Sequence, residues 1–180
     1  MVMMMQIELE PFDKKYLGFL DRIWKYKGVN KYSGIPSGGI DIKRWHDQYL
    51  LSKKGKAFRS EQYIILLDGR PAGEEAFGML YEAFTFGDWE KDVFRPCSLA
   101  DIKIREYLWG KGIASEAMRK MIEIIFTSTD SLDIIAIVHK NNSRAKRLFE
   151  RCGFKDTQKG NIKDNIVYLL SKEGWEDGKD

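Results

Sequence analysis

Residues 102–117 read Ile102-Lys-Ile-Arg-Glu-Tyr-Leu-Trp-Gly-Lys-Gly-Ile-Ala-Ser-Glu-Ala117, an alternating strand that runs into a glycine turn and then a periodic helix. Gly110 and Gly112 at this junction allow backbone N–H groups to gather around an anion at a helix N-terminus, where the helix dipole favours negative charge. Lys111 adds a cation on the same turn. The stretch therefore predicts a binding site for a pyrophosphate.

Other glycine motifs fit this turn less well. A P-loop needs Ser or Thr directly after its Gly-Lys pair, and here Gly112 follows Lys111. A dinucleotide fingerprint needs a third glycine at the helix start and an acidic residue about twenty positions further on. Only two glycines are present, and Asp130 and Asp133 lie in loop-like sequence. From the turn alone, a tight turn that binds nothing remains an open alternative.

Two motifs together resemble the GNAT superfamily of N-acyltransferases. Residues 109–117 look like its coenzyme-A-binding motif, Gln/Arg-x-x-Gly-x-Gly/Ala, matched by Gly112 and Ala114. Trp109 stands where Gln or Arg is usual, as in the ribosomal-protein and aminoglycoside acetyltransferase branches. Residues 142–154 resemble the next family motif, Asn-x-x-Ala-x-x-x-Tyr-x-x-x-Gly-Phe. The spacing between the motifs also fits, and the pair covers residues 99–155.

The resemblance implies an enzyme that uses acetyl-CoA as co-substrate. Backbone amides of residues 110–115 would hold the pyrophosphate, and the strand ending near Ile104 would pair with the pantetheine arm. A main-chain N–H on that strand would polarise the thioester carbonyl. Asn142 matches a residue that contacts the coenzyme arm, and Arg147 either reaches a phosphate or lies on a solvated helix face. The implied coenzyme-binding residues are Ile102, Ile104, Trp109, Gly110, Lys111, Gly112, Ile113, Ala114, Ser115, Asn142, Arg147 and Phe149.

The general base is expected among the carboxylates near the glycine turn. Asp101 is the first candidate, because similar aminoglycoside acetyltransferases carry an aspartate before an Ile-Gly pair there; in this chain Arg105 stands where the glycine is expected. Glu106 and Glu82 are alternatives, and an ordinary solvent-facing carboxylate remains open for Asp101. A carboxylate would both attract a cationic amine and accept its proton.

The general acid of many family members is missing from its usual place. A tyrosine four residues before the Gly-Phe pair commonly protonates the leaving thiolate, and this chain has Phe149 there. Tyr107 is a candidate substitute or a packing residue beside Trp109. Because a thiolate leaves readily near neutral pH, no assigned acid is required.

The acceptor is expected to be a primary amine of a small polyamine, an aminoglycoside-like sugar, a protein N-terminus or a lysine derivative. Asp88, Trp89, Glu90 and Asp92 form an acidic, aromatic segment that suits a cationic amine or an ordinary surface turn. A non-catalytic acyl-CoA-binding module is the rival interpretation.

Composition predicts a single domain over residues 1–180. The net charge of +3, with basic residues scattered among acidic ones, argues against a nucleic-acid partner. Two cysteines and two histidines without ligand spacing argue against a disulfide framework or a metal site. Met1–Met5 is too short for a signal peptide, and no stretch suits a membrane span. We expect a cytoplasmic monomer or homodimer.

The periodicity predicts interleaved strands and helices. We expect strands over residues 7–9, 63–67, 76–86, 99–105, 133–138 and 166–170, and helices over residues 16–24, 41–51, 113–125 and 145–152. Residues 28–39, rich in Gly and Ser, are expected to form a loop. This order predicts an α/β fold with a mixed sheet and helices on both sides. The resemblance implies the same GNAT-like acyl-CoA N-acyltransferase fold, an α+β mixed sheet that is mostly antiparallel.

Overall fold

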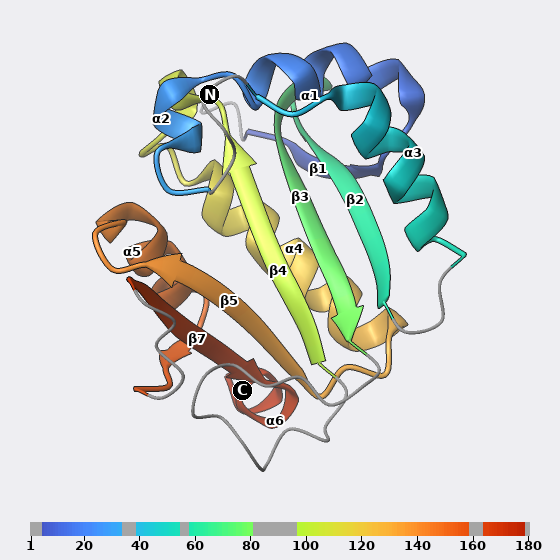
Figure 1. The fold of residues 1–180 in the computed structure, drawn as a ribbon. Coiled ribbons are helices and arrows are strands. Elements are labelled where there is room, and N and C mark those ends of the chain that lie inside the picture. Colours follow the sequence, from blue (N-terminus) through green and yellow to red (C-terminus); the bar gives the residue numbers. More distant parts are fainter. Residues whose placement is uncertain (1–4, 34–38, 55–57, 81–96, 159–163, 179–180) are drawn as a thin grey trace.

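The computed structural model describes residues 5–33, 39–54, 58–80, 97–158 and 164–178. Within these ranges one sheet has the strand order β1-β2-β3-β4-β5-β7-β6 (Figure 1). Its strands are β1 (Ile7–Pro11), β2 (Phe58–Leu67), β3 (Arg70–Leu80), β4 (Cys97–Ile104), β5 (Asp133–His139), β6 (Lys155–Asp156) and β7 (Asn165–Ser171). The helices are η1 (Lys14–Tyr16), α1 (Leu17–Ile23), α2 (Lys27–Asn30), α3 (Ile42–Ser52), η2 (Glu106–Leu108), α4 (Ile113–Ser128), α5 (Ser143–Arg151) and α6 (Lys172–Asp177).

Helices cover both faces of the sheet, so neighbouring residues of β2 are buried against different helices. Ile64 and Leu66 pack with buried residues of α1, and partly buried residues of α3 complete that cluster. Ile65, between them, packs on the other face against Ile113 and Ala117 of α4. The predicted α/β fold with a mostly antiparallel sheet flanked by helices is confirmed.

Both strands of the β2–β3 hairpin start earlier than predicted. β2 begins at Phe58, five residues before the predicted start, and β3 begins at Arg70, six residues before it. The turn between them forms at Asp68 and Gly69, with φ values of 48° and 74° that suit a tight hairpin turn. A register shift between Ile65 and Leu66 accommodates the early part of β3. Residues 81–86 lie outside the described ranges.

β4 and β5 run parallel and pair only over Cys97–Leu99 and Asp133–Ile135. Beyond these residues the two strands diverge, as Figure 1 shows, with α2 and α5 flanking their separated ends. The parts that do not pair with each other, residues 100–104 of β4 and 136–139 of β5, lie at the end of the sheet where β4 leads into the glycine turn. The divergence of β4 and β5 leaves the space in which the candidate site lies.

The two helices that border the site form as predicted. Ile113, Ala117, Met121 and Ile125 recur every four residues on α4 and are at most 1% exposed. Asn142 caps α5 through its Oδ1, which accepts the Ala145 N–H at 3.1 Å.

Several short elements were not predicted: α2, which lies in the expected loop, η2, β6 and α6. The start of α2 depends on a distant residue, because Glu106 Oε1 accepts the Gly28 N–H at 2.7 Å. Local sequence does not reveal such a contact. In the described ranges, no helix has the length and apolar character needed to cross a membrane.

Candidate functional site

A cleft of about 800 Å³ fills the space between the diverging strands. β4, the glycine turn, the first turn of α4, the end of β5, α5 and the segment around α2 surround it. The residues predicted to bind coenzyme that line it are Ile102, Ile104, Trp109, Gly110, Gly112, Ile113, Ala114, Ser115, Asn142, Arg147 and Phe149, and Asp101 lines it as well. The fold thus brings together nearly all of the predicted site.

The glycine turn (residues 109–112) leads into α4, and the first turn of that helix borders this cleft. Gly110 and Gly112 have φ values of 77° and 82°, and a Cβ added at either would meet nothing within 4 Å. Gly112 is the N-cap residue of α4 and provides no side-chain hydrogen bond. The first backbone hydrogen bond of the helix runs from the Glu116 N–H to the Gly112 carbonyl. The amides of residues 113–115 therefore have no acceptor within the helix. Lys111 is exposed and does not line the cleft.

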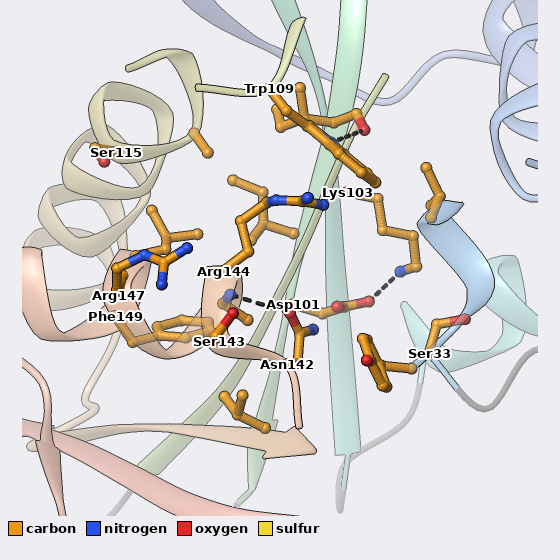
Figure 2. Close-up of a pocket in the computed structure, with 18 of the residues that line it drawn as sticks. Ser33, Asp101, Lys103, Trp109, Ser115, Asn142, Ser143, Arg144, Arg147 and Phe149 are labelled. Carbon is orange, nitrogen blue, oxygen red and sulfur yellow. Dashed lines mark hydrogen bonds and ion pairs between the residues drawn. The ribbon is translucent and has the colours of Figure 1, made fainter. Parts of the chain in front are cut away.

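Arg144 links α5 to the glycine turn. Its guanidinium lies 3.9 Å from the centroid of the Trp109 ring, and the Trp109 indole donates to Ile104 O at 2.8 Å (Figure 2). Arg144, Arg147 and Arg151 recur at helical spacing and all line the cleft. This end of the cleft carries positive charge and free amides, the combination that binds phosphate groups.

The open edge of β4 supplies main-chain groups to the cleft. Hydrogen-bonded residues alternate along an antiparallel pair, and the Arg105 N–H donates to Ala72 O at 3.0 Å. Arg105, Lys103 and Asp101 therefore direct their main-chain groups towards β3. The residues between them, Ile102 and Ile104, direct theirs away from β3 and towards β5. Because the strands part beyond Leu99, the N–H and C=O of Ile102 face the cleft.

Asp101 lies where the cleft meets a smaller cavity of about 290 Å³ on the α1–α3 face of the sheet. Its side chain is 60% exposed and forms an ion pair with Lys103 (Figure 2). Lys103 in turn lies 3.2 Å from Glu74 Oε1. The residues lining the smaller cavity are Trp24, Ser33, Ile40, Trp45, Ser60, Gln62, Glu74, Ala76, Asp101 and Lys103.

Two other candidates for proton transfer, Glu106 and Tyr107, line neither cavity. Glu106 holds α2 through Gly28, and Tyr107 is 65% exposed with its hydroxyl accepting from Arg105 Nη1 at 3.0 Å. Glu82 and the acidic segment 88–92 fall outside the described residues.

Phe149 lines the cleft from the core side. Its ring is 5% exposed, meets Phe154 edge-on at 5.1 Å and stacks on Tyr168 at 6.4 Å. This aromatic packing accounts for a hydrophobic ring at the position.

Sequence reasoning missed several lining residues. The Tyr32 ring stacks on the His139 ring at 4.9 Å, which joins the segment after α2 to the end of β5. No local pattern indicates that contact. Arg144 was detectable, because it lies three residues before Arg147 on the same helix face.

The family follows from a comparison with family models, in which the acetyltransferase (GNAT) domain matches residues 6–155. The chain belongs to the GNAT acetyltransferase family. The predicted family and enzyme class are confirmed. No curated protein matches this chain.

Solved structures show the same fold for this GNAT chain. The aminoglycoside acetyltransferase AAC(6')-Ib, in complex with ribostamycin and coenzyme A, matches with a TM-score of 0.81 at 19% identity, covering 97% of this chain and 98% of that one. The spermidine N-acetyltransferase from Vibrio cholerae, in complex with CoA and spermine, matches with a TM-score of 0.72 at 15% identity, covering 95% and 98%. A domain from Methanocaldococcus jannaschii matches with a TM-score of 0.68 at 20% identity, covering 93% and 99%.

Proposed function

We propose that this GNAT domain transfers the acetyl group of acetyl-CoA to a primary amine by direct attack. The observation that carries the proposal is the meeting of three features in one cleft: the amides at the start of α4, the open main chain of Ile102, and the Asp101 carboxylate. Similar structures have been crystallised with coenzyme A and amine acceptors, which supports the same pair of substrates for this chain.

The coenzyme would lie with its phosphates at the positive end of the cleft. The amides of residues 113–115 and the α5 arginines suit the pyrophosphate and the remaining phosphate. The pantetheine arm would continue along β4, where the Ile102 C=O and the Ile104 N–H point away from β3 as a neighbouring strand would require. Asn142 would contact the arm from the start of α5.

In the reaction, the amine nitrogen bonds to the acetyl carbon while the carbon–sulfur bond breaks. Asp101 would attract the amine and accept the proton that the nitrogen loses, because it is exposed at the junction of the two cavities. The N–H of Ile102 would stabilise negative charge on the thioester oxygen. The thiolate would leave without a hydroxyl at Phe149, whose ring packs in the core.

Release of free thiol from acetyl-CoA, measured with and without a panel of amines, tests this function. The panel should contain a monoamine, a polyamine, an aminoglycoside and a peptide with a free N-terminus. Amine-dependent thiol release with a matching acetylated product is expected. Tight coenzyme binding without any amine-dependent release would favour the non-catalytic acyl-CoA-binding module instead. A cytoplasmic location and a monomeric or homodimeric state stay predictions.

A further inference from the structure

The smaller cavity contains a buried lysine beside the expected position of the acceptor amine. The Lys103 side chain is 11% exposed and lies between two carboxylates, Asp101 and Glu74. Burial lowers the pKa of Lys103, but these two carboxylates outweigh it and hold the pKa above its ordinary value. Lys103 is therefore charged, and its ammonium is bound in an acidic cavity as the ammonium of a substrate would be.

Glu74 already has three partners and is nearly inaccessible to a second cation. Its Oε1 accepts from the Trp24 indole and lies 3.2 Å from the Lys103 ammonium, and its Oε2 accepts from Gln62. Its side chain is 3% exposed. Among the described residues lining the smaller cavity, the two carboxylates and one ammonium sum to a single negative charge, and the exposed part of that charge is on Asp101.

One side of the smaller cavity is apolar. Trp24 and Trp45 meet edge-on there at 4.9 Å, together with Ile40 and Ala76, while the neutral polar residues Ser33, Ser60 and Gln62 also line the cavity. A volume of about 290 Å³ suits a small molecule. Among the described residues, the lining thus offers one position for a cationic nitrogen, at Asp101, and an apolar side for the body of the acceptor.

We infer that Lys103 determines acceptor specificity by filling one of two adjacent cation positions, so that the cavity takes an amine with a single positive charge on a small apolar or aromatic body. The inference rests on the proposed function and narrows its acceptor to monoamines. A diamine or polyamine would bring a second ammonium towards Lys103, and like charges at close range disfavour the wrong ligand.

The test compares two amines of equal length, n-hexylamine and 1,6-diaminohexane, which differ by one ammonium group. We expect the wild-type kcat/KM for hexylamine to exceed that for the diamine by at least about tenfold, a difference typical of one unfavourable charge contact. Equal use of the two, or preference for the diamine or for spermidine, would overturn the inference.

Substitutions at Lys103 separate its charge from its bulk. Lys103→Met keeps a similar length without the ammonium, and the ratio of kcat/KM values should shift at least about tenfold towards the diamine. Lys103→Arg retains the charge and should keep the wild-type ratio. An unchanged ratio in Lys103→Met would contradict the inference. If that variant does not fold, the double substitution Glu74→Gln with Lys103→Met removes both buried charges and should shift the ratio in the same direction.

Calorimetry of both amines with the coenzyme-A complex distinguishes the inference from the proposed function. A monoamine preference in binding without any turnover would support the inference and refute catalysis. Turnover without any preference, in binding or in rate, would support the acetyltransferase and refute the role of Lys103.

Discussion

Gly112→Asp tests the glycine turn most directly. Gly112 has a φ of 82°, its position leads into α4, and a Cβ there would point into open space. The substitution therefore adds a carboxylate beside the amides of residues 113–115 without a steric clash. Asp is among the residues that tolerate this backbone conformation best, so we expect a folded protein with a modest loss of stability.

The size of the effect follows from charge. Two unit charges about 4–5 Å apart near a protein surface repel by roughly 3–4 kcal/mol. Gly112 is exposed, and salt screens exposed charges, so we expect about 1.4–3 kcal/mol of this repulsion to persist at moderate ionic strength. The dissociation constant for coenzyme A should then rise roughly 10–150-fold, and the loss should shrink as salt is added.

Calorimetric titration with coenzyme A measures this change. Gly112→Asn is the matched variant, because it has nearly the same shape without the charge, and it should bind at least about tenfold more tightly than Gly112→Asp. Gly69→Asp controls for the backbone, because Gly69 has a φ of 74°, open space around its Cβ and no place in either cavity. A folded Gly112→Asp protein that binds coenzyme A within about threefold of wild type would refute an anion site at this turn.

Four further predictions concern acidic and aromatic residues of the cleft and the sheet beneath it. Asp101→Asn should lower amine turnover by roughly 10²-fold or more with coenzyme binding intact; steady-state rates within about threefold of wild type would remove Asp101 as the base. Phe149→Tyr should change kcat only by a small factor, whereas a gain of roughly 10²–10⁴-fold would reveal a missing general acid. Phe149→Ala should lower the free energy of unfolding by about 3–5 kcal/mol in denaturant titrations. Burial, with a smaller effect from Asp101, raises the pKa of Glu75 well above its usual range, and its oxygens lack hydrogen-bond partners among the described residues. The folded protein therefore keeps this proton to a higher pH than the unfolded chain, and the contribution of Glu75 to stability falls as pH rises from about 4.3 through its raised pKa in the folded state. Glu75→Gln should raise the melting temperature relative to wild type, increasingly so from pH 5 to pH 8; a constant difference would contradict this assignment.

The parts of the fold that were predictable from sequence depend on local patterns. The four-residue repeat from Ile113 to Ile125 predicted α4, because it reports one buried helix face, and the continuous apolar run at residues 134–138 predicted β5, because it reports a strand buried on both faces. α2 was not predictable in this way. It has four residues, none of them buried, and a carboxylate from Glu106 holds its first turn.

In the candidate site, too, the residues within local motifs were predictable and the contacts between distant segments were not. The glycine turn and the α5 motif are contiguous in sequence, and most of their predicted residues line the cleft. The contact between Tyr32 and His139 joins segments more than a hundred residues apart. No periodicity connects such segments, so only the folded chain reveals that they share a wall of the site.

The charge at the acceptor side depends on strand register. Glu74 and Glu75 are neighbours in sequence, and β3 directs them to opposite faces of the sheet. Register pairs Glu74 with Lys103, so this carboxylate is satisfied, whereas Glu75 pairs with Ile102 and is buried without a partner among the described residues. A slip of one residue would turn Lys103 towards the core and Ile102 away from it. Burial of the Ile102 side therefore keeps Asp101 and Lys103 on the face that carries Glu74 and the smaller cavity, and the packing of the core determines which charges meet the acceptor.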